Sequence, residues 1–238
     1  MTFRFPDISS HQSGMPTANL PALLAKATQG TWYTNPDYVP AKGRAAATGT
    51  VFGAYHFLEV GNGAAQADYC FSKVGKTPLM LDFEEYTSGG VLRQPKVADA
   101  VAFIDRYRAL GGVTNLLYLP KWYWQKIGSP SLQPLIDRGM KLVSSVYTTY
   151  SDTGPGWSAY GGMTPVVWQY TSSATVNGFS PVDMNACKLT LDQFKQVIGA
   201  APMATADVLI AQALRDLGYV EGTGGLTKFG QWYAQFTK

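Results

Sequence analysis

The sequence predicts an α/β protein: an irregular, TIM-like (β/α) barrel that ends in a β-hairpin and carries a short C-terminal helical extension. Short apolar runs of strand length alternate with segments of helical periodicity, which favours a parallel sheet with helices outside it. About eight such runs occupy roughly 190 of the 238 residues, which fits one barrel over residues 1–200. The pattern changes after residue 200, so we expect a separate extension over 201–238.

The apolar runs predict the strands of the barrel. They are Phe3–Ser9, Ala22–Thr28, Val51–Leu58, Pro78–Glu85, Asn115–Pro120, Lys141–Tyr147, Val166–Ser172 and Val182–Ala186. The last two runs are joined by a short segment that contains Asn177 and Gly178, a dipeptide typical of two-residue hairpin turns. We therefore expect the sheet to end in a hairpin and not in a helical crossover.

Four segments between or after these runs show the helical period together with start or stop signals. They are Asp37–Thr48, Ala64–Val74, Pro95–Leu110 and Leu191–Ile198. The third begins with proline and is followed by Gly111 and Gly112, which favour a helix end. The fourth has Thr190 as its expected N-cap and Gly199 as its expected stop.

The extension beyond Pro202 contains two further helical patterns. Thr205 would cap the first and Thr227 the second, and the second carries aromatic residues at helical spacing. Two short helices cannot hold a core alone. Their simplest interpretation is that they pack on the barrel; the alternative is that they form a surface for an external partner or a second subunit.

Composition and motifs exclude several functions. A net charge of +3, without a Lys/Arg run or a glycine-rich phosphate loop, predicts no nucleic-acid partner. No apolar run reaches the roughly 18 residues that a membrane helix needs, so we expect no membrane insertion. The N-terminus lacks the apolar region of a signal peptide, which predicts synthesis in the cytoplasm without a leader.

The histidines and cysteines predict no metal and no cofactor, because two histidines and two cysteines form no ligand motif. We expect His56 to be a buried structural histidine with a hydrogen-bond partner. Cys70 and Cys187 are interpreted as two buried thiols, with a long-range disulfide as the alternative. Cys70 falls within an expected helix, which is a poor position for an exposed nucleophile.

The acids of "PLMLDFEE" are the strongest candidates for chemistry. Side chains alternate along a strand, so Asp82 and Glu84 would point into the barrel mouth together, whereas Glu85 would point away into solvent. Two close carboxyls disfavour double ionisation, which raises the pKa of one of them. A protonated acid beside an ionised partner is what cleavage of a glycosidic bond requires. The alternative is that the strand ends at Leu81 and the acids lie in a solvated loop or cap the next segment.

Two more acids are expected at the same mouth. Asp7 ends the first predicted strand and Asp183 lies on the last, and these strands are neighbours in a closed barrel. Polar and aromatic residues near strand ends could bind sugar rings by stacking and hydrogen bonding. Considered singly, each aromatic residue is more typical of the core. The candidate substrate-binding residues are Tyr55, Tyr118, Trp122, Tyr147, Trp168 and Gln169.

The motifs "DISSHQ", "KATQGTWYTNPDY", "GAYHF", "LMLDFEE" and "WQYTS…VDMN" resemble, in this order, glycoside hydrolase family 25. These are the Chalaropsis-type lysozymes, or N-acetylmuramidases, which are common among bacteriophage endolysins. The resemblance spans about residues 3 to 199. It implies an irregular barrel with a terminal hairpin, and cleavage without metal of the β-1,4 bond between N-acetylmuramic acid and N-acetylglucosamine in the glycan strands of bacterial peptidoglycan.

The resemblance also implies roles for individual residues. Glu84 would be the general acid, and Asp82 its partner that stabilises the positive centre by orienting the acetamido group of the substrate. Asp7 and Asp183 would be the remaining acids of the mouth, with Tyr55 as a hydrogen-bonding neighbour. The implied outcome is retention of configuration with help from the neighbouring group.

The sequence departs from the family pattern at two places. Gln29 stands where the family usually has an acid, so a role that needs charge there is in doubt. The segment between Gln12 and Leu23 is shorter than the usual helix, which could open one side of the groove. Two other functions therefore stay open: a non-catalytic protein that binds cell wall, with the C-terminal aromatic helices contributing, and a thiol-dependent peptidase or amidase of the wall.

Overall fold

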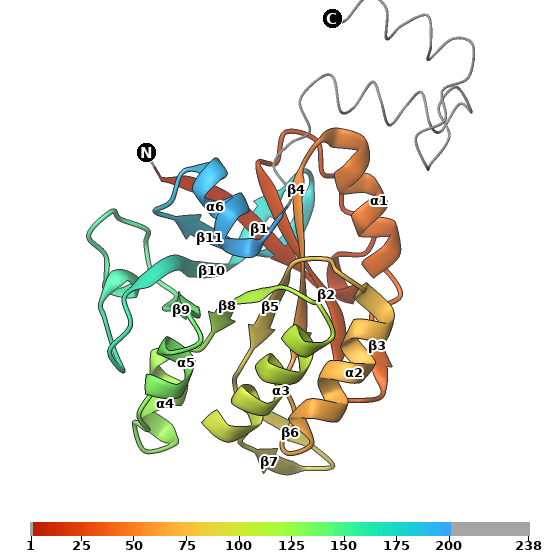
Figure 1. Cartoon of the computed structure of the whole chain (residues 1–238). Helices are drawn as coiled ribbons and strands as arrows, with labels where there is room; N and C mark the ends of the chain where they lie inside the picture. Colours follow the sequence, from red (N-terminus) through yellow and green to blue (C-terminus); the bar gives the residue numbers. More distant parts are fainter. Residues whose placement is uncertain (1, 201–238) are drawn as a thin grey trace, which may run out of the picture. The chain divides into compact units, whose positions relative to one another are not determined.

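The computed structural model describes residues 2–200, and these form a closed β-barrel surrounded by helices (Figure 1). The barrel strands are β1 (Phe3–Ile8), β2 (Ala22–Gln29), β4 (Val51–Phe57), β5 (Leu79–Asp82), β8 (Thr114–Tyr118), β9 (Lys141–Ser145), β10 (Pro165–Val176) and β11 (Phe179–Cys187). The helices predicted at Thr205 and Thr227 lie outside the described residues. The predicted α/β barrel is confirmed.

The barrel closes because β1 pairs with both β2 and β11. Strands β2, β4, β5, β8, β9 and β10 follow one another in parallel, while β11 runs antiparallel to both β10 and β1. Asn177 and Gly178 form the turn between β10 and β11, with φ angles of 48° and 83°. Positive φ at both turn residues matches the right-handed twist of a hairpin, which confirms the predicted hairpin ending.

The four predicted helices are present, with small shifts at their ends. They are α1 (Tyr38–Thr48), α2 (Gly63–Val74), α3 (Val97–Ala109) and α6 (Leu191–Ile198). Thr190 caps α6 as expected: its hydroxyl accepts a hydrogen bond from the Gln193 amide, and Gly199 ends the helix at φ 72°. Helix α3 begins at Val97 and not at Pro95, because Lys96 is extended and acts as the N-cap, with its amide donating to Asp99 Oδ2 at 2.8 Å.

Several short elements do not appear among the sequence predictions. They are β3 (Tyr33–Thr34), β6 (Tyr86–Ser88), β7 (Val91–Arg93), α4 (Lys121–Lys126), α5 (Gln133–Ile136) and the 3-10 turns Ser10–Gln12 and Pro155–Trp157. Each spans one or two turns or a few strand residues, which is too short for a periodic pattern to develop. Figure 1 shows β6 and β7 as a small hairpin after β5, and α4 and α5 between β8 and β9.

Two apolar layers hold the barrel together. Outside the sheet, Leu79, Leu81 and Phe83 pack with α2 and α3. Phe103 and Tyr107 of α3 are fully buried in this layer. Inside the sheet, Met80 packs with the inward side chains of neighbouring strands. Helix α6 adds Phe194 and Ile198 to this inner layer, against Phe5 near the beginning of β1. The barrel interior is therefore filled at the end opposite to Asp7, which leaves room only at the other end.

The cysteines and His56 are structural. Cys70 and Cys187 are free buried thiols, so the alternative of a long-range disulfide is wrong. Burial raises the pKa of Cys70 to about 12, although a hydrogen bond with Thr28 opposes the shift. His56 is fully buried, hydrogen-bonds to Thr28 Oγ1 at 2.8 Å and to Gln66 Oε1 at 3.2 Å, and stacks on Phe103. Across residues 2–200, no helix is long and apolar enough to cross a membrane.

Candidate active site

A pocket of about 230 Å³ opens at the end of the barrel where the parallel strands finish. Its lining residues are Asp7, Ser9, His11, Lys26, Tyr55, Phe57, Met80, Asp82, Glu84, Tyr118, Tyr147, Gln169 and Asp183. All four predicted catalytic acids are among them, as are four of the six predicted substrate-binding residues. The structure thus brings together residues from β1, β5 and β11 and the loops that follow the parallel strands.

Strand β5 aims its acids into the pocket by alternation. Met80 and Asp82 point inward, whereas Leu81 and Phe83 lie in the apolar layer under the helices. Regular strand pairing stops at Asp82, and the chain remains extended enough to place Glu84 in the same pocket. The expectation that the two acids share a cavity is confirmed, although the strand is shorter than predicted. Glu85 points away and pairs with Lys126 at 2.6 Å.

Burial, together with the charges of neighbouring acids, raises the pKa of each of these carboxyls. Burial raises the pKa of Glu84 to about 7, with the charge of Asp7 adding to it and that of Lys26 opposing it. The pKa of Asp82 lies well above its ordinary value through burial and the charge of Glu84. Asp82 Oδ1 is buried without a hydrogen-bond partner among the described residues. The pair therefore holds a proton near neutral pH and leaves one oxygen free for a ligand.

Asp183 differs from Asp7 in its partners. Burial raises the pKa of Asp183 to about 7, and the charges of Asp7 and Glu84 add to the shift. Burial also raises the pKa of Asp7, but two amide donors oppose that shift. Asn185 Nδ2 and Gln169 Nε2 donate to Asp7 Oδ2 at 2.7 and 2.9 Å. Asp7 is thus the acid of the group whose ionised form has the strongest hydrogen-bond support.

Gln169 connects Asp7 to the aromatic side of the pocket. Its Oε1 accepts hydrogen bonds from Tyr118 Oη at 3.0 Å, Tyr147 Oη at 2.9 Å and Ser145 Oγ at 3.3 Å. Its amide nitrogen meanwhile donates to Asp7. The side-chain amide of Gln169 is therefore fixed in one orientation, and the rings of Tyr118 and Tyr147 are held in the lining of the pocket.

Lys26 is a pocket residue that the sequence predictions missed. It is the one lysine or arginine that lines the pocket, and burial lowers its pKa while Asp82, Glu84 and Glu59 oppose that shift. Its ammonium lies 4.7 Å from the centre of the Phe57 ring. The available signal was the residue itself, because a single charge inside the apolar run "ALLAKAT" needs a reason to be there.

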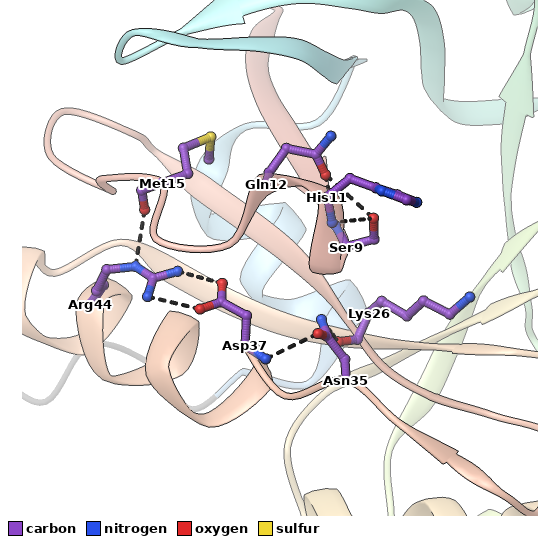
Figure 2. A network of polar contacts seen from close by, with 8 residues as sticks. All are labelled: Ser9, His11, Gln12, Met15, Lys26, Asn35, Asp37 and Arg44. Atoms are coloured by element: carbon purple, nitrogen blue, oxygen red, sulfur yellow. Dashed lines mark hydrogen bonds and ion pairs between the residues drawn. The ribbon is translucent and has the colours of Figure 1, made fainter.

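The backbone around Lys26 is anchored by a polar network behind the pocket (Figure 2). Asn35 Nδ2 donates to the Lys26 carbonyl at 2.8 Å, and Asn35 Oδ1 accepts from the Asp37 amide at 3.0 Å. Asp37 forms a two-pronged ion pair with Arg44, whose Nε donates to the Met15 carbonyl. Figure 2 shows the Lys26 side chain extending away from this ion pair. The network joins β2, α1 and the loop after β1.

Gln29, which stands where the family usually has an acid, hydrogen-bonds to the carboxylate of Glu59. Lys26 Nζ donates to Gln29 Oε1 at 2.7 Å, and Gln29 Nε2 donates to Glu59 Oε1 at 3.0 Å. Trp32 Nε1 donates to the same Glu59 oxygen at 3.1 Å. The Gln29 amide therefore connects the Lys26 ammonium to the Glu59 carboxylate. Glu59 is a second residue that the sequence predictions missed.

Two predicted substrate-binding residues lie elsewhere. Trp168 is fully buried, packs against Trp157 on the outer side of the sheet and donates from Nε1 to the Val146 carbonyl. The prediction that Trp168 contacts substrate is therefore wrong, because it occupies the outward register of β10 while Gln169 faces in. Trp122 lies on α4 and lines an adjoining hollow outside the acid pocket.

The pocket contains carboxyls but no site for a metal in the described part of the chain. No group of three His, Cys, Asp or Glu side chains there has the arrangement of metal ligands. Both cysteines lie away from the pocket lining. The chemistry offered by these residues is that of a protonated acid, an ionised partner and polar groups that orient a ligand.

The chain is similar to proteins of one family. The model of the family described as "Glycosyl hydrolases family 25" matches residues 7–179. The N,O-diacetylmuramidase of Chalaropsis sp. is 32% identical over 194 residues, which cover 72% of this chain and 89% of the relative. This agreement confirms the resemblance to the family that the sequence motifs indicated.

Solved structures share the fold. The muramidase from Trichobolus zukalii has a TM-score of 0.68 at 24% identity, covering 83% of this chain and 99% of that one. The catalytic domain of endolysin ply40 from bacteriophage P40 of Listeria monocytogenes has a TM-score of 0.61 at 22% identity, covering 84% and 98%. The barrel with its acid-lined mouth, the matched motif order and these likenesses agree, and the chain belongs to glycosyl hydrolase family 25.

Proposed function

We propose that this enzyme is a muramidase that hydrolyses the β-1,4 bond between N-acetylmuramic acid and N-acetylglucosamine in peptidoglycan. The observation that carries the proposal is the pair Asp82 and Glu84 in one pocket, with the pKa of Glu84 raised to about 7. The name of the Chalaropsis relative, an N,O-diacetylmuramidase, supports the choice of substrate. Of the two motives for the non-catalytic alternative, Gln29 is weakened, because Gln29 bonds to Lys26 and all four acids line the pocket. The other motive, the C-terminal aromatic helices, lies outside the described residues.

Glu84 would supply the proton for bond cleavage. With its pKa raised to about 7, a large fraction of Glu84 is protonated up to neutral pH, and this form donates its proton to the glycosidic oxygen as the bond to the anomeric carbon breaks. The leaving N-acetylglucosamine then departs with a new hydroxyl. The resulting Glu84 carboxylate next removes a proton from water, and the water oxygen bonds to the anomeric carbon. The proton taken from water restores Glu84, which completes the cycle.

Asp82 would act on the acetamido group of the muramic acid. Its Oδ1 is buried and has no partner among the described residues, so it can accept a hydrogen bond from the acetamido N–H. This contact would hold the acetamido oxygen against the anomeric carbon, where it forms a transient bond that water later displaces. Two displacements retain the configuration at that carbon. Lys26 balances the remaining negative charge, while Asp7 and Tyr55 line the wall beside it.

The conservative variant Glu84→Gln tests the proposal. We expect it to keep the fold and lose at least about 100-fold in turnover, because the amide cannot donate a proton to the leaving oxygen. Release of new reducing ends from purified peptidoglycan measures the activity, and mass spectrometry shows whether muramic acid carries the new end. Glu85→Gln is the matched control, since Glu85 points away from the pocket. Lysis by Glu84→Gln at the wild-type rate would contradict the proposal.

We infer that the biological setting is lysis of a bacterial cell wall, as by a phage endolysin. The similarity to the ply40 catalytic domain and the order of the family motifs support this setting. The protein would then be made in the host cytoplasm and act on the wall outside. Turbidity loss of Gram-positive or actinobacterial cell walls on addition of the purified protein tests it, and intact walls after cleavage of soluble glycan would count against it.

A further inference from the structure

A second hollow, of about 460 Å³, continues the catalytic pocket on one side. It shares Glu84, Tyr118 and Tyr147 with that pocket. Its other lining residues are Lys121, Trp122, Gln125, Ser145 and Val146, from α4 and the end of β9. Because three side chains line both cavities, a chain of sugars bound at Glu84 can pass from one into the other.

With Asp82 and Glu84 in the roles proposed above, the hollow falls on the leaving-group side of the bond to be cut. Asp82, which would hold the acetamido group of the muramic acid, lines the catalytic pocket but not the hollow. Glu84, which would protonate the leaving oxygen, lines both. The muramic acid that is attacked would therefore lie beside Asp82, and the sugars of the leaving part would lie beyond Glu84, in the hollow. In an alternating glycan strand these are first N-acetylglucosamine and then another muramic acid.

The hollow offers a cation that no described residue neutralises. Lys121 makes no hydrogen bond or ion pair within residues 2–200, and its side chain is half-buried. Lys126, on the same helix, is by contrast paired with Glu85 at 2.6 Å. A half-buried ammonium that faces a groove next to a bound carbohydrate favours a carboxylate on that carbohydrate.

Aromatic faces flank this cation. Trp122 is 47% exposed and Tyr147 is 56% exposed, so both rings are open to a ligand. The Tyr147 hydroxyl is nevertheless fixed, because it donates to Gln169 Oε1 at 2.9 Å. A ring that is held at its hydroxyl and open on its face suits stacking against a sugar. Gln125 adds an amide that can bond to hydroxyl or acetamido groups.

We propose that this hollow is a leaving-side subsite for a muramoyl residue, in which Lys121 pairs with a carboxylate on the lactyl arm. The proposal rests on the proposed function, since it takes the direction of the strand from the roles of Asp82 and Glu84. The carboxylate has two possible sources: the lactyl group itself in peptide-free strands, or the stem peptide where one is attached. Both place a carboxylate on the same arm of the sugar.

Binding to an inactive enzyme tests the subsite without cleavage. In the Glu84→Gln background, the dissociation constant of soluble peptide-free glycan strands is measured by calorimetry for Lys121→Met and for the control Lys126→Met. We expect Lys121→Met to weaken binding roughly 5- to 20-fold, the loss of one charge-assisted contact. Lys126→Met should leave the dissociation constant within about twofold, because an exposed ion pair contributes little.

A neutral substrate separates charge from packing. Converting the lactyl carboxyls of the same strands to methylamides should remove the difference between Lys121→Met and the parent protein. Strands that still carry stem peptides identify the source: an effect of Lys121→Met on these alone assigns the stem carboxylates, and an effect on peptide-free strands assigns the lactyl group. Equal dissociation constants for all variants on both charged substrates overturn the subsite.

Kinetics on the active enzyme distinguish failure of the subsite from failure of the proposed function. We expect Lys121→Met to raise KM on charged strands by roughly 5- to 20-fold and to change kcat less than about twofold, because Lys121 would bind the leaving part and not the reacting atoms. A fall in kcat alone overturns the role. If the wild-type protein releases no reducing ends, the proposed function fails, and the binding measurements still decide the subsite.

Discussion

At the scale of single residues, the pocket depends on how charge is distributed around two acids. Lys26 faces Asp82 and Glu84 on one side and reaches Glu59 through the Gln29 amide on the other. Negative charge is therefore still present in this region, one hydrogen bond further from Lys26 than an acid at position 29 would place it. The distance of that charge should affect the pKa of Glu84.

The variant Gln29→Glu tests this coupling. A carboxylate at position 29 would attract the Lys26 ammonium and add negative charge near the pocket, so we expect a higher pKa of Glu84. The alkaline limb of the profile of kcat against pH should move up by about half a unit. The double variant Gln29→Glu with Glu59→Gln exchanges the two groups and keeps the total charge, and its alkaline limb should return towards that of the wild type. An unchanged limb in the single variant would show that position 29 is not coupled to Glu84.

The same raised pKa sets the direction of the pH dependence of activity. Glu84 must be protonated to donate, so activity should be kept below its pKa of about 7 and decline as the pH rises through that value. Measuring kcat between about pH 5 and pH 9 with reducing-end release checks the decline. A profile that still rises above about pH 8 would mean that another group supplies the proton.

At the scale of elements, alternation and capping were the features that could be predicted. Strand β5 places Asp82 and Glu84 inward because side chains alternate, and α6 begins at the predicted cap Thr190. The same rule gives no information on which face of a strand is inward when both faces carry large residues. In β10, Trp168 and Gln169 are adjacent and only the closed sheet decides that Gln169 lines the pocket. The short helix α4 has too few residues for a periodic signal.

The cap of α6 has a measurable contribution to stability. Thr190→Ala removes the acceptor for the Gln193 amide, and we expect the free energy of unfolding to fall by about 1 kcal/mol. Thr190→Ser keeps the oxygen and should lose much less. Because α6 fills the barrel end opposite to the acids, activity at low temperature should be unaffected by either change. Thermal unfolding followed by circular dichroism measures the loss, and equal stability of both variants would argue against the capping box.

At the scale of the whole molecule, the four acids meet only because the barrel closes. Asp7 and Asp183 stand directly opposite each other in the antiparallel pairing of β1 and β11, while Asp82 comes from the other side of the barrel. The sequence indicated the acids and their strands, and the closed order of strands followed from the barrel hypothesis. Lys26 and Glu59 could not be assigned in this way, because their roles depend on hydrogen bonds between different strands and loops.

The buried acids should make the fold less stable as they ionise. The pKa values of Glu84 and Asp183 are raised to about 7, so between their ordinary values and 7 the folded protein binds more protons than the unfolded chain. The free energy of unfolding from these groups is therefore highest at low pH and declines as the pH rises through this window. Glu84→Gln should reduce the decline and be more stable than the wild type at about pH 8. Urea unfolding at about pH 5 and pH 8 measures both effects, and a steeper decline in the variant would contradict them.

The antiparallel pairing of β1 with β11 has a consequence for the timing of activity during translation. Asp7 emerges from the ribosome among the first residues, yet its two amide donors, Gln169 and Asn185, are made 162 and 178 positions later. A chain that ends before the hairpin keeps the pairing of β1 with β2 but lacks the pairing with β11 and both amide donors to Asp7. We therefore expect a fragment that lacks β10 and β11 to be inactive, because its barrel cannot close and Asp7 loses both amide donors.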